Sequence, residues 1–229
     1  MEYHVYNQMK YAVAKSPEIL KEALASDEYG IELKTDGASY ILAKDLDGSV
    51  HLYGDKISKK TGEIIDKIDN VAHLKSWATI AFPRGSQMVV EILYKYNFAE
   101  RKFEKHSNSK FVNSIMLCNP EKANERQLST QLCGAYVFDL LYWDNESWWD
   151  KDFIDRYNKL MEIRDDLFRR NLDCVSVQYA QLITENKERV IADWLAAGEE
   201  GGVLKLLRSN KKASAKYAVS EIGETPKRP

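Results

Sequence analysis

The chain has 229 residues, of which 44% are hydrophobic and 30% are charged, and its formal net charge is −2. This composition is typical of a globular protein, and the length allows one large domain or two small ones. The near balance of charge excludes a polycation, so binding to nucleic acid would depend on a local basic surface. The sequence shows neither a signal-peptide pattern nor an apolar run of the roughly 18 residues that span a membrane, so we expect a cytoplasmic protein.

The hydrophobic patterns along the chain predict short strands mixed with helices. In chain order, we expect a helix over residues 17–26, strands over 31–37, 40–43 and 50–53, a polar loop or ribbon over 56–70, a helix over 71–80, a strand over 88–94, an exposed charged segment over 97–109, helices over 111–116 and 121–132, a strand over 135–142, a helix over 150–170, a strand over 175–182, a helix over 185–197 and a last strand over 199–207. This mixture of hairpins and helices predicts an α+β domain with antiparallel sheets.

The stretch Ile31–Gly37 is the strand around which we expect the other elements to be arranged. Its apolar residues Ile31 and Leu33 alternate with charged ones, because successive side chains on a strand point to opposite faces. The charged face consists of Glu32, Lys34 and Asp36. An Asp-Gly pair between apolar runs predicts a tight turn, so we expect Asp36–Gly37 and also Asp47–Gly48 to form hairpins.

The cysteines and histidines show no spacing that indicates a metal site. Three cysteines are too few and too scattered for a disulfide framework or a tetrahedral zinc site. We expect Cys118, Cys133 and Cys174 to be reduced and buried, as in a protein of the cytoplasm.

Three apolar strands carry charged groups that a purely structural core would not favour. They are Lys34 with Asp36, Glu91, and Glu200 with Lys205. If these strands are neighbours, the charges compensate one another in one cleft. A lysine there is a candidate nucleophile, and carboxylates there are candidate ligands for a divalent metal or a ribose hydroxyl. Taken one at a time, the same residues also fit a solvated strand face.

The stretch Lys34-Thr35-Asp36-Gly37 resembles the KxDG signature of covalent nucleotidyltransferases, which include ATP-dependent DNA ligases, RNA ligases and capping enzymes. Further motifs of that family follow in the expected order: Glu91 on an apolar strand, Phe138–Tyr142, and the EGxxxK pattern of Glu200–Lys205. Two more stretches, Ile57–Gly62 and Ser114–Ala123, resemble phage-type ATP-dependent DNA ligases in particular. The resemblance covers nearly the whole chain and implies a single adenylation domain over residues 1–229 with the nucleotidyltransferase fold, in which antiparallel sheets and helices surround an ATP cleft.

The resemblance implies a reaction in three steps. Lys34 would attack the α-phosphate of ATP, expel pyrophosphate and keep AMP as a phosphoramidate. The AMP would pass to a 5′-phosphate at a nick in duplex DNA, and a 3′-hydroxyl would then displace it and seal the strand. Because negative charge develops on the transferred phosphate, Mg²⁺ and basic side chains are expected to stabilise the transition state.

The resemblance also assigns nucleotide contacts. Glu91 would contact the ribose, Phe138 would stack on the adenine ring and Lys205 would face the phosphate. Glu32 would lie near the adenine edge, and Gly37 completes the nucleotide-binding set. By base rate, however, an aromatic residue on an apolar strand such as Phe138 is also an ordinary core residue.

The catalytic set implied by the resemblance is Lys34, Asp36, Glu91, Glu200 and Lys205. Within it, Asp36 would orient the lysine or the ribose. Glu200 and Glu91 would provide the carboxylates for Mg²⁺. The expected partners are ATP and nicked duplex DNA, and we expect a monomer.

The chain departs from the family pattern at several points. Ser39 stands where the family often has an arginine, and Gly54–Asp55 stands where phage-type ligases usually have Ser-Arg. The last lysine motif and the small OB-type domain of the family are not found in the sequence. Two alternatives therefore remain open: an RNA ligase or capping-type enzyme, and a weakened relic that binds a nucleotide or nucleic acid without catalysing ligation.

Overall fold

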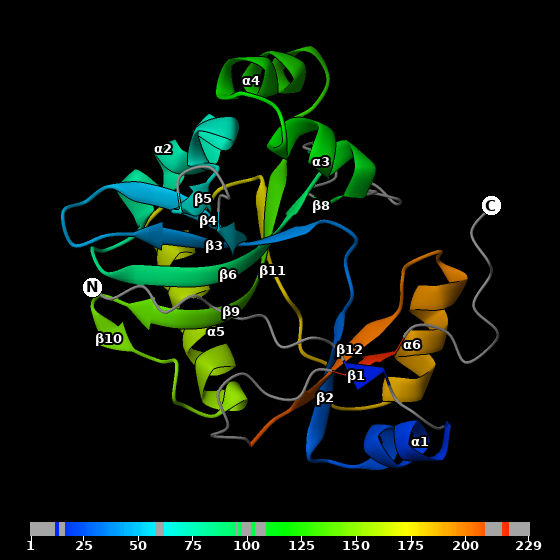
Figure 1. The fold of residues 1–229 in the computed structure, drawn as a ribbon. Coiled ribbons are helices and arrows are strands. Elements are labelled where there is room, and N and C mark those ends of the chain that lie inside the picture. Colours follow the sequence, from blue (N-terminus) through cyan, green and yellow to red (C-terminus); the bar gives the residue numbers. More distant parts are fainter. Residues whose placement is uncertain are drawn as a thin grey trace. The chain divides into compact units, whose positions relative to one another are not determined.

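The computed structural model describes residues 12–13, 17–57, 62–94, 96–97, 102–103, 109–208 and 217–219. These residues form two compact units (Figure 1). The first unit contains the described residues of 36–151 and 155–179. The second contains the described residues up to 35, residues 152–154 and the described residues from 180 onward.

The first unit is built on a sheet whose described strands run in the order β10-β9-β6-β3-β4-β5, with β11 paired in parallel to β9. Its strands are β3 (Ala38–Lys44), β4 (Val50–Ile57), β5 (Ile64–Asp66), β6 (Ser86–Leu93), β9 (Gly134–Trp143), β10 (Glu146–Ser147) and β11 (Val177–Tyr179). A separate pair is formed by β7 (Tyr96–Asn97) and β8 (Lys102–Phe103). Its helices are the 3₁₀ helix η1 (Ile68–Val71), α2 (Ala72–Ala81), α3 (Ser109–Met116), α4 (Pro120–Ser129) and most of α5 (Phe153–Arg169).

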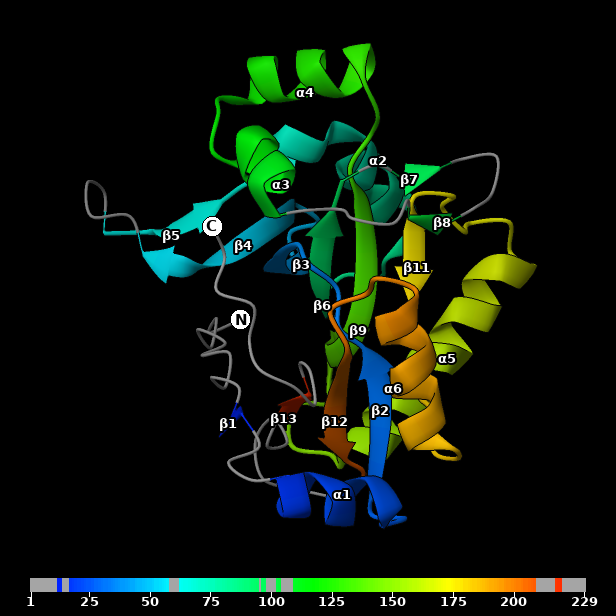
Figure 2. The same cartoon turned by 90° about the vertical axis from the view of Figure 1, so that its right-hand side faces the viewer.

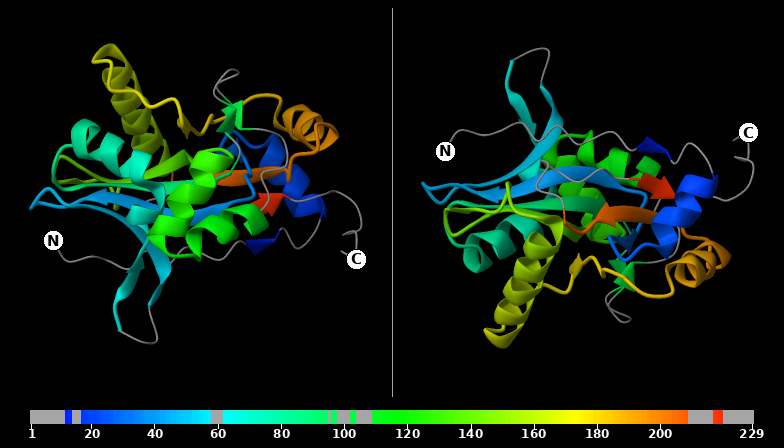
Figure 3. Two further views of the ribbon diagram at one scale, coloured as in Figure 1. Left: turned by 90° about the horizontal axis from the view of Figure 1, so that it is seen from above. Right: turned by 90° about the horizontal axis from the view of Figure 1, so that it is seen from below.

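The core of the first unit lies between this sheet and its helices. Figure 3 shows α2 and α5 on the same side of the sheet. Alternate residues of β6 face them: Met88, Val90 and Ile92 are fully buried and belong to one cluster with Leu74 of α2 and Leu160 of α5. A slip of one residue would turn Gln87 and Glu91 toward the helices in place of this apolar row, and this fixes the register of β6.

The hairpin predicted at Asp47–Gly48 is confirmed. It joins β3 to β4, which pair antiparallel. Gly48 has φ +94°, a left-handed conformation that favours glycine, and the Ser49 N–H donates to Asp47 Oδ1 at 2.8 Å. The turn fixes β3 beside β4. On its other edge β3 pairs antiparallel with β6, and this register sets Ser39 opposite Glu91.

The second unit has a smaller sheet, in which the described strands run in the order β1-β13-β12-β2. Figure 2 shows β2 and β12 side by side. Its two described helices, α1 and α6, each contribute an apolar face to the core. The buried residues of this core are Leu20, Leu24, Ile31, Ile191 and Leu204. The elements of this unit are β1 (Ala12–Val13), α1 (Pro17–Ala25), β2 (Tyr29–Leu33), α6 (Lys187–Ala196), β12 (Gly202–Leu206) and β13 (Tyr217–Val219).

The hairpin predicted at Asp36–Gly37 is wrong. β2 ends at Leu33, and the next strand, β3, belongs to the other sheet, so these four residues after Leu33 connect two sheets instead of folding one strand back on its neighbour. A glycine is required at position 37 for another reason: its backbone packs directly on β6. The strand therefore covers 29–33, not 31–37.

The other predicted elements occur with shifted boundaries. The helix predicted over 150–170 begins at Phe153, and the strand predicted over 175–182 is shortened to Val177–Tyr179. The last strand begins at Gly202 and not at residue 199, because Gly198 and Gly201 have positive φ values of 84° and 115° that interrupt an extended backbone. The predicted motif residues 58–61, most of the charged segment 97–109 and the basic tail residues 209–216 and 220–229 lie outside the described residues.

None of the described helices is both long and apolar enough to cross a lipid bilayer.

Candidate active site

Lys34 is the first residue after β2, and strand pairing brings it to the beginning of β12. In the antiparallel pair Leu33 faces Gly202, and the Lys34 N–H donates to the Gly201 carbonyl at 2.9 Å, which extends the pairing by one step. The amine of Lys34 forms an ion pair with the carboxylate of Glu200. The two side chains are 24% and 31% exposed, so the amine is oriented by its partner and is still open to a small molecule.

Glu32 and Lys205 form a second ion pair between the same two strands, and this pair is buried. Glu32 faces Val203, which sets Lys205 at the diagonal position on β12. The Lys205 Nζ lies 2.9 Å from Glu32 Oε2, and the side chains are only 2% and 3% exposed. The alternative of a solvated strand face therefore does not hold at Glu32, because Lys205 provides the charge that allows the carboxylate to be buried.

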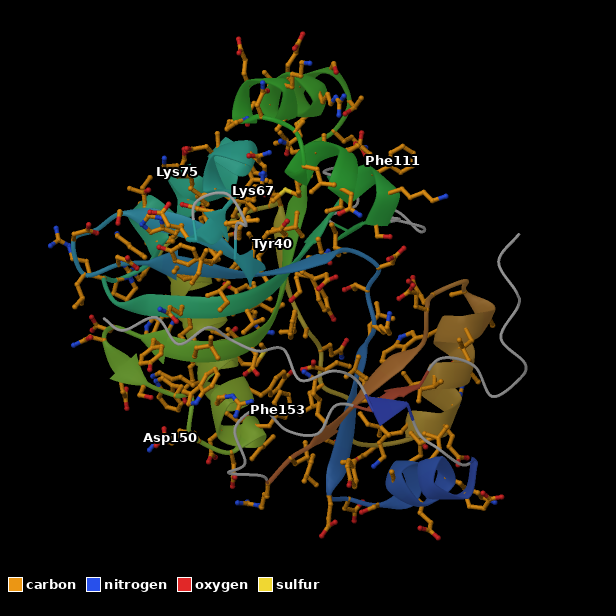
Figure 4. The ribbon with its side chains drawn as sticks, in the orientation of Figure 1. Tyr40, Lys67, Lys75, Phe111, Asp150 and Phe153 are labelled. Atoms are coloured by element: carbon orange, nitrogen blue, oxygen red, sulfur yellow. The ribbon has the colours of Figure 1, made fainter. Side chains whose placement is uncertain are left out.

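The amine of Lys205 also lies over an aromatic ring. Its Nζ is 4.8 Å from the ring centroid of Phe153, which is fully buried and begins α5 (Figure 4). A cation over an aromatic face is stabilised electrostatically. These contacts make Lys205 a residue that joins β2, β12 and the start of α5, whereas its contact with a phosphate stays a prediction.

Gly37 approaches β6 so closely that only glycine fits. A Cβ at this position would lie 2.3 Å from the carbonyl oxygen of Ile92 and 2.8 Å from Cγ of Glu91. The Gly37 N–H donates to Glu91 Oε1 at 3.1 Å. The glycine thus orients the carboxylate that the sequence predicts to contact the ribose, and two members of the predicted site meet within the first unit.

Asp36 lies at the N-terminus of a helix. Its Oδ2 accepts a hydrogen bond from the Ser109 N–H, at 3.1 Å, and Ser109 is the first residue of α3. The first N–H groups of a helix have no partner within it, and this end carries a partial positive charge, so a carboxylate is stabilised here. Asp36 and Gly37 therefore attach the connection that follows Lys34 to α3 and β6.

Phe138 lies on β9, next to β6 in the sheet, and its side chain is partly exposed. Tyr136 is directly opposite Glu91 in this pairing, so Phe138 is two residues further along the neighbouring strand. Within the first unit, Asp36, Gly37, Glu91 and Phe138 thus belong to adjacent elements. Glu32, Lys34, Glu200 and Lys205 form the two ion pairs of the second unit.

The described carboxylates fit a Mg²⁺ ion that is held partly by the phosphates of a bound substrate. Among the described residues, no group of three or more His, Cys, Asp or Glu side chains is arranged to hold a metal ion. Mg²⁺ in nucleotide sites is often held by one or two carboxylates together with substrate phosphates and water. Glu200 is a partly exposed carboxylate, already beside one cation, and its chemistry suits this mode.

A buried ion pair in the first unit was not predicted from the sequence. The guanidinium of Arg156 donates to both carboxylate oxygens of Asp139, from Nε at 2.7 Å and from Nη2 at 3.0 Å. The signal was present: Arg156 interrupts the apolar stripe formed by Phe153, Leu160 and Ile163 on α5, and Asp139 interrupts an apolar strand.

Comparison with known proteins shows the family to which the chain belongs. A family model described as "ATP dependent DNA ligase domain" matches residues 8–220. No curated protein matches the chain.

Several solved ligase structures are similar in fold. The ligase domain of LigD from M. tuberculosis matches with a TM-score of 0.55 and 16% identity, covering 84% of this chain and 52% of that one. A Lig E DNA ligase matches with 0.52 and 15% identity, covering 85% of this chain and 62% of that one. The Chlorella virus DNA ligase-adenylate matches with 0.50 and 15% identity, covering 92% and 66%. At these identities the likeness shows the fold, and the chain spans about half to two thirds of the length of these structures.

The observed mixture of helices with curled antiparallel sheet is thus the ligase nucleotidyltransferase fold that the sequence predicts. Since the family model matches nearly all of the sequence, the chain belongs to the family of ATP-dependent DNA ligase domains.

Proposed function

We propose that this chain is an adenylation domain of an ATP-dependent DNA ligase and that Lys34 is its nucleophile. The observation that carries the proposal is the ion pair between Lys34 and Glu200, two partly exposed residues 166 positions apart that meet beside the pairing of β2 and β12. An exposed strand face would not need this convergence. Membership in the ligase family supports the same assignment.

The proposed step is transfer of AMP to the lysine. The partly exposed amine of Lys34 first gives its proton to solvent water, and a bond then forms between Lys34 Nζ and the α-phosphorus of ATP. The bond from that phosphorus to the bridging oxygen breaks, and pyrophosphate leaves with the electron pair. Glu200 fixes the position of the amine before the attack, which lowers the entropy lost on reaching the reactive geometry.

Other residues bind the nucleotide in this proposal. Glu91, oriented by the Gly37 N–H, accepts hydrogen bonds from ribose hydroxyls, and Phe138 stacks on adenine. Asp36 holds the segment after Lys34 through its bond to α3. Glu200, with Glu91 as the second proposed carboxylate, would hold Mg²⁺, whose charge stabilises the developing negative charge on the phosphate.

The experiment is incubation with ATP labelled on the α-phosphate in the presence of Mg²⁺. We expect label to remain on the denatured protein, and to be absent from Lys34→Ala. Lys21→Ala is the matched control, because Lys21 is an exposed lysine on α1 of the same unit. Label that survives Lys34→Ala, or a wild-type chain that retains none, would contradict the proposal.

Strand sealing is a separate part of the proposal, because the chain spans only part of the ligase structures that it resembles. We propose nicked duplex DNA as the substrate, with nicked RNA as the alternative. The adenylated protein should transfer AMP to a 5′-phosphorylated nick in DNA faster than to the same nick in RNA. Equal or faster transfer to RNA would change the assignment to an RNA ligase and leave the lysyl-AMP chemistry intact.

A further inference from the structure

Strand β9 contains a β-bulge at the residue proposed to stack on adenine. Along β6, Val89 faces Asp139 and the next residue, Val90, faces Val137, so Phe138 is an additional residue on β9. Burial agrees with this register: Val137 and Leu140 are both fully buried in the same core cluster although they are three residues apart. A regular strand would repeat this face every two residues. A bulge redirects side chains and bends the strand, and it is a way in which proteins aim a residue.

The residue after Phe138 is clamped from α5. Asp139 accepts hydrogen bonds from Arg156 Nε and Nη2, at 2.7 Å and 3.0 Å, and from the Leu140 N–H, at 2.9 Å. Arg156 Nη1 also donates to the Lys151 carbonyl at 2.7 Å. The guanidinium therefore ties the bulge to both α5 and the segment that leads into it.

The burial of this pair suggests a role in specifying geometry. The two side chains are 2% and 3% exposed, so both ions have lost their hydration. A buried ion pair is often no more stabilising than apolar residues of similar size, but it has strict requirements for direction. A bidentate Arg–carboxylate pair holds its partners in one plane, which a lysine does not do. If Asp139 left the bulge position, the carboxylate and the Arg156 guanidinium would each be buried without the opposite charge.

We propose that Arg156 is a positioning residue for nucleotide binding: through Asp139 it locks the bulge of β9 and so fixes the direction of the Phe138 ring. This inference rests on the proposed role of Phe138 as the adenine-stacking residue. Arg156 itself touches no substrate in this account. Its substitution changes nucleotide affinity only because Phe138 is no longer held in one orientation.

The test is a double-mutant cycle on AMP binding, measured by calorimetry, which avoids the covalent step. Arg156→Lys keeps the charge and removes the planar fork, and Phe138→Ala removes the ring. We expect each single variant to weaken AMP binding about tenfold, within the range measured for stacking on one base. The double variant should bind as weakly as Phe138→Ala alone, because Arg156 acts through that ring. Arg164→Lys, in an exposed pair with Asp165 on the same helix, is the matched control and should bind AMP normally.

The outcomes separate this inference from the proposed function. A further loss in the double variant equal to that of Arg156→Lys alone would assign Arg156 a merely structural role and overturn the inference, whether or not Lys34 is adenylated. Coupled losses in a protein that binds AMP but forms no lysyl-AMP would support the inference and refute the adenylation proposal. A wild-type chain that does not bind AMP would overturn both.

Discussion

Glu32 and Lys205 form a buried ion pair, 2.9 Å between Oε2 and Nζ, that joins β2 to β12. The residue that follows β2 by one position is Lys34, and the residue that precedes β12 by two positions is Glu200. The buried pair thus fixes the two strands whose ends present the partly exposed pair. The register between β2 and β12 therefore determines both the buried Glu32–Lys205 pair and the position of Lys34, the proposed nucleophile.

Removal of one partner of this pair should strongly destabilise the second unit. Lys205→Met leaves the Glu32 carboxylate buried without its cation, and such changes cost about 3–5 kcal/mol. The free energy of unfolding, measured by urea denaturation, is the quantity to compare. The double variant Glu32→Gln with Lys205→Met should recover most of the loss, because no buried charge remains. If the single variant were as stable as the wild type, the pair would not be buried as described.

Gly37 should tolerate no side chain. Gly37→Ala would force a Cβ to within 2.3 Å of the Ile92 carbonyl oxygen, so the connection or β6 must shift. We expect a destabilisation of about 1–3 kcal/mol, typical of overpacking. Nucleotide binding should also weaken, because the shift displaces the backbone N–H that orients Glu91. Both are measured on the purified variant. Gly54→Ala is the control: its Cβ would meet Tyr40 Cε1 at an ordinary 3.6 Å, and little change is expected.

His73 should make stability depend on pH. Burial lowers the pKa of this histidine from its ordinary value of 6.5, and the hydrogen bond of Nε2 to the Cys133 carbonyl, at 2.7 Å, opposes the shift only in part. The unfolded chain therefore binds a proton more readily than the folded one. The resulting stability is complete above pH 6.5 and is lost as the pH falls below that value toward the folded-state pKa. Urea denaturation between pH 7.5 and about 5 should show a smaller decrease in His73→Gln than in the wild type, and equal decreases would refute the assignment.

The three cysteines should react at different rates. Burial raises the pKa of Cys133 to about 12, so it carries almost no thiolate at neutral pH, whereas Cys118 and Cys174 are partly exposed. The expectation that all three are buried is therefore wrong for two of them. Alkylation followed by peptide mass spectrometry should modify Cys118 and Cys174 first. Early modification of Cys133 would show that its environment is open.

The sequence predicted the elements of this fold better than their connections. The hydrophobic period located the strands and helices because their apolar faces are required for burial. It did not reveal that β2 and β3 belong to different sheets, because an Asp-Gly pair is read as a local turn signal. Glycine is required at position 37 because the carbonyl of Ile92, 55 residues later in the chain, approaches it closely. A close contact of this kind is set by tertiary packing.

The candidate site shows the same division. The order of the motifs singled out Lys34 and Glu200, and the structure confirms that they meet. The partners of Glu32 and Asp139 were not predicted, because a carboxylate on a strand is usually solvated and the sequence does not contain the strand register or the helix that supplies the cation. Arg156 and Asp139 show which pattern predicts a buried ion pair: a basic residue within an apolar helical stripe, together with an acid within an apolar strand.

The account depends most directly on Lys34 as the nucleophile. Tandem mass spectrometry of the purified chain after incubation with ATP and Mg²⁺ tests it, because it locates an adduct to a single residue. The account predicts one AMP on the peptide that contains Lys34, bound to its Nζ and lost in acid as a phosphoramidate. An unmodified Lys34 peptide, or AMP on another residue, would contradict it.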